Sequence, residues 1–179
     1  MAESNVIECE RLYIEPFSEK HLTMTYVDWL NDPEVVRYSE QRFRKHTLDS
    51  CEAYWQSFKG TPNYFWAIVR KSAGLHLGNI NAYLDVVNNV ADMGILIGSR
   101  ESWGNGYGTE AWKAVCGYLF NSVGIRKITA GTMAKNEAML GIMRKSGMVD
   151  DGRRIRHVLF EGSEVDMVHA ALFREEARK

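Results

Sequence analysis

Three glycines alternate with other residues in the segment Trp103-Gly-Asn-Gly-Tyr-Gly-Thr-Glu-Ala111. Because glycine has no Cβ, neighbouring backbone N–H groups in such a loop can turn toward one point and an anion can approach them closely. The preceding run Met93–Ile97 is apolar, and the residues from Tyr107 onward have a helical pattern. A helix start adds unpaired N–H groups and the positive end of its dipole. The chemistry predicted for this segment is therefore phosphate binding.

Two other phosphate-binding motifs fit this segment poorly. A Walker loop places Lys and Ser or Thr after its last glycine, whereas Gly108 is followed by Thr109 and Glu110. A dinucleotide-binding loop is followed by an acidic residue at the end of the next strand, and the segment Arg126–Gly131 ends without one. The alternative that stays open is a glycine-rich turn that binds nothing.

The composition is that of one soluble globular domain. The chain has 179 residues, 45% hydrophobic and 25% charged, and we expect a single domain over residues 1–179. A formal net charge of -1 disfavours bulk binding to nucleic acid or to an anionic membrane. We therefore expect no nucleic-acid partner and no membrane partner, and either a monomer or a homodimer.

The cysteines predict neither disulfides nor a metal site. Cys9, Cys51 and Cys116 are far apart and lack the spacing of metal ligands. No apolar run is long enough to span a membrane, and the chain does not begin like a signal peptide. These features predict a cytoplasmic protein with reduced thiols and no metal.

Hydrophobic periodicity and turn residues divide the chain into alternating strands and helices. Strands are expected at Leu12–Ile14, Tyr64–Val69, Leu75–Leu84, Val90–Ile97, Ile125–Thr129, Arg154–Phe160 and Glu164–Leu172. Helices are expected at Ser18–Leu30, Thr47–Phe58, Tyr107–Phe120 and Asn136–Ser146. The order predicts an α+β (mixed α/β) fold with a central, mostly antiparallel sheet of about seven strands flanked by helices. The phosphate ligand should lie at the C-terminal end of the fourth strand.

Five segments together resemble the GNAT superfamily of N-acetyltransferases, and within it the RimJ/RimL-like branch, over nearly the whole chain. They are Arg11-Leu-Tyr-Ile14, Trp29-Leu-Asn-Asp-Pro-Glu34, Ala91–Ile97, Trp103–Ala111 and Asn136–Met148. The resemblance implies a single GNAT-like domain whose parallel strand pair splays apart at the cofactor site. It also implies acetyl-coenzyme A (acetyl-CoA) as cosubstrate and no metal.

The resemblance assigns cofactor roles to particular residues. The glycine loop would bind the pyrophosphate through its backbone amides, and Asn136 would contact the pantetheine arm. A backbone N–H at the end of the fourth strand would bond the thioester oxygen. The expected cofactor-binding residues are Ile95, Ile97, Trp103, Gly104, Asn105, Gly106, Tyr107, Gly108, Thr109 and Asn136.

The group that protonates the leaving thiolate is left open. Many relatives have a tyrosine seven residues after the helix-opening Asn, whereas this chain has Met143 there, which cannot donate a proton. Tyr107 or a bound water could serve instead. The thiolate could also leave without a dedicated acid.

Two carboxylates are candidates for the base that removes a proton from the acceptor amine. Asp92 is the first, because relatives often have an acidic residue there and strand alternation places it on the same face as Gly94 and Leu96. Glu40 is the second. The alternative for Asp92 is a solvated or salt-bridged strand carboxylate.

The segment that contains Glu40 is expected to form the acceptor pocket. Arg42, Arg44, Lys45 and His46 concentrate positive charge there, which favours a phosphorylated or otherwise acidic acceptor. Tyr38 could stack on a base or a sugar, so Tyr38, Arg42 and Arg44 are the predicted substrate-binding residues. The alternative for each of them is an ordinary solvated loop.

The sequence thus predicts an acetyl-CoA-dependent N-acetyltransferase that transfers acetyl directly to a primary amine in a ternary complex. The acceptor would be a small molecule or a peptide, with a nucleotide-linked amino sugar favoured and the N-terminus of a (ribosomal) protein as the alternative. A non-catalytic sensor of coenzyme A (CoA) is the alternative from another class.

Overall fold

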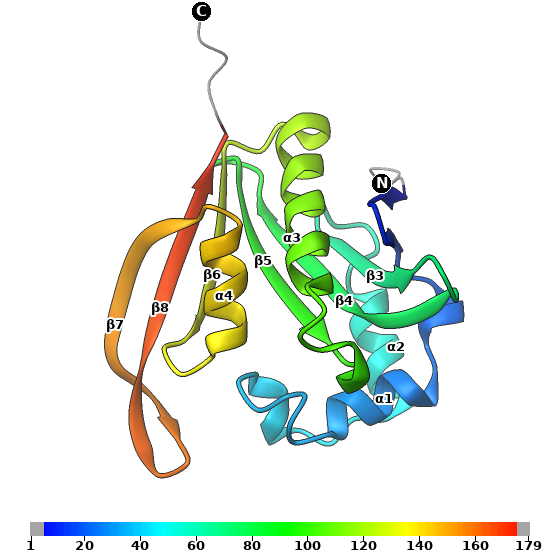
Figure 1. The fold of residues 1–179 in the computed structure, drawn as a ribbon, viewed down its shortest axis with the longest axis horizontal. Coiled ribbons are helices and arrows are strands. Elements are labelled where there is room, and N and C mark those ends of the chain that lie inside the picture. Colours follow the sequence, from blue (N-terminus) through cyan, green and yellow to red (C-terminus); the bar gives the residue numbers. More distant parts are fainter. Residues whose placement is uncertain (1–5, 175–179) are drawn as a thin grey trace, which may run out of the picture.

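The computed structural model describes residues 6–174, which form one eight-stranded sheet with helices on both faces (Figure 1). The ends of the expected domain, residues 1–5 and 175–179, lie outside the described residues. The strands are β1 (Ile7–Glu8), β2 (Leu12–Pro16), β3 (Tyr64–Arg70), β4 (Leu75–Asp85), β5 (Val90–Ile97), β6 (Lys127–Met133), β7 (Val149–Phe160) and β8 (Ser163–Phe173). The α-helices are α1 (Met24–Asn31), α2 (Leu48–Gln56), α3 (Tyr107–Tyr118) and α4 (Glu137–Lys145). Shorter helical turns are η1 (Glu19–His21), η2 (Glu40–Phe43), η3 (Arg100–Ser102) and the π-helical η4 (Leu119–Val123).

The sheet order is β1-β2-β3-β4-β5-β6-β8-β7, and every neighbouring pair except β5 and β6 is antiparallel. The predicted α+β class and mostly antiparallel sheet are therefore confirmed. The strand not anticipated is β1, whose two residues are too few to show alternation in the sequence.

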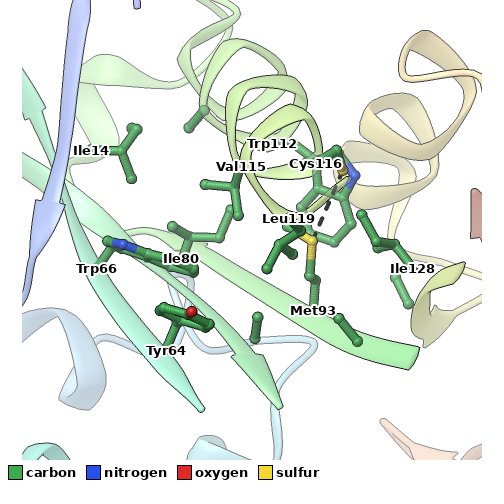
Figure 2. Close-up of a cluster of buried hydrophobic side chains, with 14 of the residues drawn as sticks. Ile14, Tyr64, Trp66, Ile80, Met93, Trp112, Val115, Cys116, Leu119 and Ile128 are labelled. Atoms are coloured by element: carbon green, nitrogen blue, oxygen red, sulfur yellow. Dashed lines mark hydrogen bonds between the residues drawn. The ribbon is translucent and has the colours of Figure 1, made fainter. Parts of the chain in front are cut away.

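Two hydrophobic clusters lie on opposite faces of the sheet. The larger contains Trp112 and Leu119 from α3 and η4 packed on Trp66, Ile80 and other sheet residues (Figure 2). The smaller packs side chains of α1 and α2 against the other face, with Leu96 at its border. Because side chains alternate along a strand, β5 contributes to both clusters.

The expected helix from Ser18 to Leu30 is divided in two. Ser18 precedes the short turn η1, and α1 begins only after Thr23, whose hydroxyl accepts the Tyr26 N–H at 3.3 Å. Threonine in an extended conformation is a strong N-cap, so a new helix starts there.

The strands β5 and β6 separate after a short parallel stretch. Their paired positions are Val90 with Lys127, Ala91 with Ile128 and Asp92 with Thr129. Both strands then continue, β5 to Ile97 held by β4 and β6 to Met133 held by β8. Their tips diverge in Figure 1, and α3 follows β5 beyond the opening. The splayed parallel pair expected from the resemblance is present.

Candidate active site

The glycine loop turns directly into the first turn of α3. Gly104 and Gly106 have φ of 77° and 79°, which only glycine adopts without strain, and Gly106 is the residue before the helix. The first helical hydrogen bond runs from the Glu110 N–H to the Gly106 carbonyl at 3.0 Å. The amides of residues 107–109 precede that bond and need partners from outside the helix. The loop has the geometry of an anion-binding helix start.

Gly108 lies where α3 packs against α4 and the end of β5. A Cβ at this position would be 3.1 Å from Cδ1 of Ile142 in α4 and 3.6 Å from Cγ1 of Ile97. A larger side chain would therefore push α3 away from both β5 and α4.

Trp103 ties the loop to the end of β5. Its indole Nε1 donates to the Ile97 carbonyl at 2.8 Å, and its own carbonyl accepts from Asn105 Nδ2 at 3.2 Å. Trp103 and Asn105 thereby fix the shape of the loop with their side chains.

Arg11, from the start of β2, also braces the loop. Its backbone N–H and its Nε donate to the two carboxylate oxygens of Glu110, each at 2.7 Å. Its Nη1 donates to the Asn105 carbonyl at 3.0 Å, and its guanidinium lies 4.6 Å from the centre of the Tyr107 ring. Glu110 therefore does more than favour the helix dipole, because it fixes a positive charge beside the loop. The partners are 99 residues apart, so no local pattern could have indicated them.

Beyond Asp92, the edge of β5 that faces β6 carries backbone groups that are not paired with β6. Gly98 donates its N–H to Leu77 across to the β4 side at 2.9 Å. Since backbone groups of alternate residues in an antiparallel pair point to the same neighbour, Gly94 also points to β4. The backbone N–H and C=O groups of Ile95 and Ile97 point the other way, into the opening between β5 and β6. An N–H at Ile95 is placed to bond a carbonyl oxygen there.

Asn136 and Met143 lie in and around α4. The Asn136 side chain caps this helix by accepting the Met139 N–H at 3.2 Å and donates to Thr132 Oγ1 at 2.9 Å. The second hydrogen of the Asn136 Nδ2 group is not used by the bond to Thr132. Met143 is 4% exposed within the larger hydrophobic cluster. Neither its chemistry nor its burial allows Met143 to act as an acid.

A cavity of about 380 Å³ lies on the face of the sheet that carries α1 and α2. We call it the acceptor cavity. Its floor includes Asn79 and Asn81 of β4 together with residues 94–96 of β5, and its walls come from α1, α2 and residues 39–46. The same stretch of β5 thus borders the acceptor cavity with one face and the β5–β6 opening with one edge.

The walls of the acceptor cavity are basic. Arg44, Lys45 and His46 line it, and none of the described residues around it is Asp or Glu. An anionic ligand would gain from both permanent charges in this recess, whereas a polycation would be repelled.

Three polar atoms around the acceptor cavity are shielded from solvent and have no hydrogen-bond partner. They are Nε2 of His46, Nδ2 of Asn79 and Oδ1 of Asn81. Asn79 is 5% exposed. Leaving such groups unpaired costs stability, so a polar ligand that bonds them is a physical explanation for their presence.

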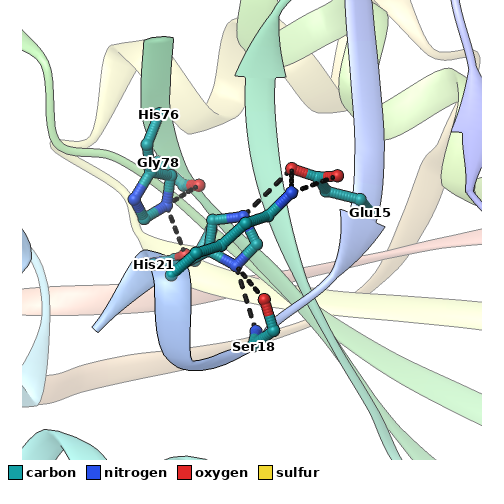
Figure 3. Close-up of polar contacts among 7 residues, drawn as sticks. Glu15, Ser18, His21, His76 and Gly78 are labelled. Atoms are coloured by element: carbon teal, nitrogen blue, oxygen red, sulfur yellow. Dashed lines mark hydrogen bonds and ion pairs between the residues drawn. The ribbon is translucent and has the colours of Figure 1, made fainter. Parts of the chain in front are cut away.

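The Asn79 side chain bonds His76, whose ring packs edge-on against His21 (Figure 3). His76 Nε2 lies 3.0 Å from the Gly78 carbonyl, to which it must donate, and 2.9 Å from Asn79 Oδ1. Burial lowers the pKa of His76 to about 4, so the ring is neutral. Nearby, His21 Nε2 bonds Glu15 at 3.0 Å. Both histidines therefore support the fold.

The two predicted carboxylate bases lie outside the lining of the acceptor cavity. Asp92 is exposed and accepts a hydrogen bond from Thr129 Oγ1 at 2.8 Å. Asp92 lies opposite Tyr83 of β4. It is on the same face of β5 as Gly94, two residues earlier in the strand. The side chain of Glu40 is 73% exposed and bonds Arg42 at 3.2 Å. The catalytic roles of both stay predictions.

The predicted substrate-binding residues do not all lie around one cavity. Arg44 lines the acceptor cavity and also a second hollow of about 690 Å³, which Arg42 lines as well. Tyr38 instead stacks on Phe160 of β7, with ring centres 5.3 Å apart. Of the three, only Arg44 reaches the acceptor cavity.

The described residues contain no cluster of three or more His, Cys, Asp or Glu side chains arranged to hold a metal ion. They also contain no helix that is both long and apolar enough to cross a membrane.

A glycine loop at a helix start, beside a splayed parallel strand pair, is the arrangement that the sequence resemblance implied for an acetyl-CoA site. Residues 11–149 match the family model described as "Acetyltransferase (GNAT) domain". The chain belongs to this family and is an acetyl-CoA-dependent N-acetyltransferase.

The chain is also similar to particular proteins and solved structures. It is 30% identical to protein YkkB of Bacillus subtilis (strain 168) over 121 residues, which cover 66% of this chain and 70% of YkkB. Among solved structures, a GNAT-family acetyltransferase from Bacillus anthracis has a TM-score of 0.82 at 20% identity, with 96% of this chain and 100% of that one covered. RimL, a ribosomal L7/L12 α-N-protein acetyltransferase in complex with CoA, has a TM-score of 0.82 at 12% identity, with coverages of 94% and 98%. These two structural likenesses concern the fold.

Proposed function

We propose that the protein acetylates a primary amine on a small acceptor that also carries an anionic group, with a nucleotide-linked amino sugar as the favoured class. The observation that carries this proposal is the acceptor cavity, where Arg44 and Lys45 occur without any carboxylate among the described lining residues. A phosphate group would bind these cations. Amines whose other groups are cationic would be disfavoured.

In this proposal the cofactor reaches β5 along the edge that faces β6, and the acceptor lies against the face that borders the acceptor cavity. The amides of residues 107–109 bind the pyrophosphate, and Asn136 contacts the pantetheine arm. The Ile95 N–H bonds the thioester oxygen as negative charge develops on it. Because Gly94, Ile95 and Leu96 border the acceptor cavity, an amine held there lies beside the thioester carbon. Proximity of this kind is a large part of catalysis in ternary complexes.

Direct transfer is supported by the state of Cys51, the cysteine that lines the acceptor cavity. Cys51 is 1% exposed, and burial raises its pKa above the usual value for a thiol. The thiolate is the nucleophilic form, so a thiol kept neutral and covered is a poor acceptor of the acetyl group. The amine itself is the better candidate nucleophile.

A protein N-terminus is the second candidate acceptor. The fold similarity to RimL and the second hollow beside the acceptor cavity favour it, because Arg44 and Lys45 line both recesses and an extended peptide could follow them. An acidic peptide would use the same cations as a phosphate group.

The test is a panel of amines measured by release of free thiol from acetyl-CoA. The panel contains nucleotide-linked amino sugars, acidic and basic peptides, polyamines and simple amines. We expect the highest kcat/KM with a phosphate-bearing amine. Preference for polyamines would contradict the anionic acceptor, and preference for acidic peptides would favour the protein N-terminus. Binding of acetyl-CoA without turnover of any amine would favour a non-catalytic CoA sensor.

A further inference from the structure

His46 is placed in the acceptor cavity by contacts that do not depend on its ring. Its backbone N–H donates to Asn31 Oδ1 and its carbonyl accepts from Asn31 Nδ2, both at 2.9 Å. Asn31 is itself anchored to Val27 of α1 at 3.1 Å. The connection between η2 and α2 is therefore fixed at His46, and the ring can be exchanged without losing this anchor.

One ring nitrogen of His46 is occupied and the other is free. The Gln41 backbone raises the pKa of His46, as a carbonyl that accepts from the ring does. Nε2 is shielded and has no hydrogen-bond partner among the described residues, so we assign the Gln41 carbonyl to Nδ1, which then carries the hydrogen. The neutral ring then has an unshared electron pair on Nε2.

The surroundings of His46 keep its ring neutral. Burial is the largest effect and lowers its pKa, and the charge of Arg44 lowers it further. The other charged or titratable groups around the cavity are Lys45 on the same segment, Tyr26 on α1, and Cys51 and Tyr54 on α2. Burial also raises the pKa of Tyr26 and of Tyr54, so both stay neutral phenols at physiological pH.

The other side chains around the cavity are poor proton acceptors. Arg44 and Lys45 are cations, and the asparagines do not take up a proton in this range. The two carboxylates predicted as bases, Asp92 and Glu40, do not line the cavity. His46 Nε2 is the basic nitrogen in this part of the described chain that has no hydrogen-bond partner and belongs to a residue lining the cavity.

We propose that His46 is the general base of the acetyl transfer, its Nε2 accepting the proton that the acceptor amine loses. The amine nitrogen forms a bond to the thioester carbon and the carbon–sulfur bond breaks, giving the amide and the CoA thiolate. The proton released by the nitrogen passes to Nε2, and the resulting imidazolium returns it to the thiolate or to solvent. This inference rests on the proposed function, because it needs an amine in the acceptor cavity.

The test compares pH profiles of kcat/KM for the acceptor at saturating acetyl-CoA. His46→Gln should lower kcat on the order of a hundredfold, the scale of losing a general base, and leave the acetyl-CoA affinity from calorimetry unchanged. In the parent, the rate should fall as the pH drops through the lowered pKa of His46. This acid limb should vanish in His46→Gln, while a limb at higher pH from the amine itself remains. Added imidazole should restore part of the activity of His46→Ala.

The rival bases provide matched controls. Asp92→Asn and Glu40→Gln should keep the low-pH limb of the parent, and thermal unfolding should show that all the variants are folded. A His46→Gln variant within threefold of the parent kcat, or a limb lost only in Asp92→Asn or Glu40→Gln, would overturn the role of His46. If no amine is acetylated by the parent at all, the proposed function itself fails and takes this inference with it.

Discussion

The two sides of β5 are built in different ways. Most of the cofactor side comes from one continuous stretch, in which the strand edge, the glycine loop and the start of α3 follow each other between residues 93 and 109, and Asn136 before α4 is the proposed contact from outside it. The acceptor side joins α1, residues 39–46, α2 and the floor of β4 and β5. A function carried by a continuous stretch leaves a motif in the sequence, whereas one assembled from distant segments does not.

The two sides also use different chemistry. On the cofactor side most of the proposed contacts are backbone amides, whose positions depend on glycine conformation and close packing. On the acceptor side they are the side chains of Arg44, His46, Asn79 and Asn81. Substitutions should therefore separate cofactor binding from acceptor recognition.

The largest expected effect is a loss of stability at acid pH that comes from His76, the residue that bonds Asn79 on the acceptor side. The pKa of His76 is about 4 in the folded chain, below its ordinary value of about 6.5 in an unfolded chain. Between these values the unfolded chain binds a proton that the folded chain does not, so the free energy of unfolding falls as pH drops through this range. The loss by pH 4 is about 3 kcal/mol.

Urea unfolding at pH 7 and pH 4 would measure this loss in the parent and in His76→Gln. The variant should lose about 3 kcal/mol less than the parent over the same interval. Equal losses in the two proteins would mean that His76 is not the neutral support of Asn79 described above.

On the cofactor side, Gly108→Val should weaken acetyl-CoA binding by about tenfold or more, which is about 1.4 kcal/mol or above. The added side chain would meet Ile142 and Ile97 and displace the first turn of α3. Gly117→Ala is the matched control, because nothing lies within 4 Å of a Cβ there in the same helix. Calorimetry that finds unchanged affinity in a folded Gly108→Val protein would remove the phosphate site from this loop.

On the acceptor side, Arg44→Gln should raise the KM of a phosphate-bearing acceptor several-fold and reduce the salt sensitivity of turnover. The KM of acetyl-CoA should hardly change. Arg42→Gln is the control, because Arg42 lines only the second hollow and is held by Ser39 and Glu40. Equal effects of the two substitutions would place the acceptor's anionic group in the second hollow instead.

The smallest effect is expected for Asn79→Leu. It removes a buried N–H group that has no hydrogen-bond partner but also the Oδ1 that bonds His76, so the two effects offset and stability should stay within about 1 kcal/mol of the parent. The acceptor KM should nevertheless increase a few-fold, since the acceptor loses a hydrogen bond. The exposed Asn88→Ala serves as a control. A clear loss of stability with an unchanged KM would show that Asn79 has only a structural role.

The sequence predicted best what local patterns determine. The bounds of β5 and the start of α3 at Tyr107 agree with the structure, because alternation and glycine loops are local signals. The clamp from Arg11 to Glu110 was not anticipated, since only the folded sheet brings these residues together.

The acceptor side shows the same limit more strongly. The basic residues at 42–46 were recognised, but their separation into two recesses depends on how the segment folds around η2. His46 was counted among the charges, whereas burial and Arg44 lower its pKa. Asn79 and Asn81 carried no signal as ordinary polar residues in a strand. Burial and pairing are three-dimensional properties that composition does not report.

A crystal structure of the protein with CoA would test the central claim most directly. We expect the pyrophosphate on the amides of residues 107–109 and the sulfur in the opening between β5 and β6, beside Ile95 and next to the acceptor cavity. A pyrophosphate bound elsewhere, or a sulfur separated from the acceptor cavity by β5, would contradict the account.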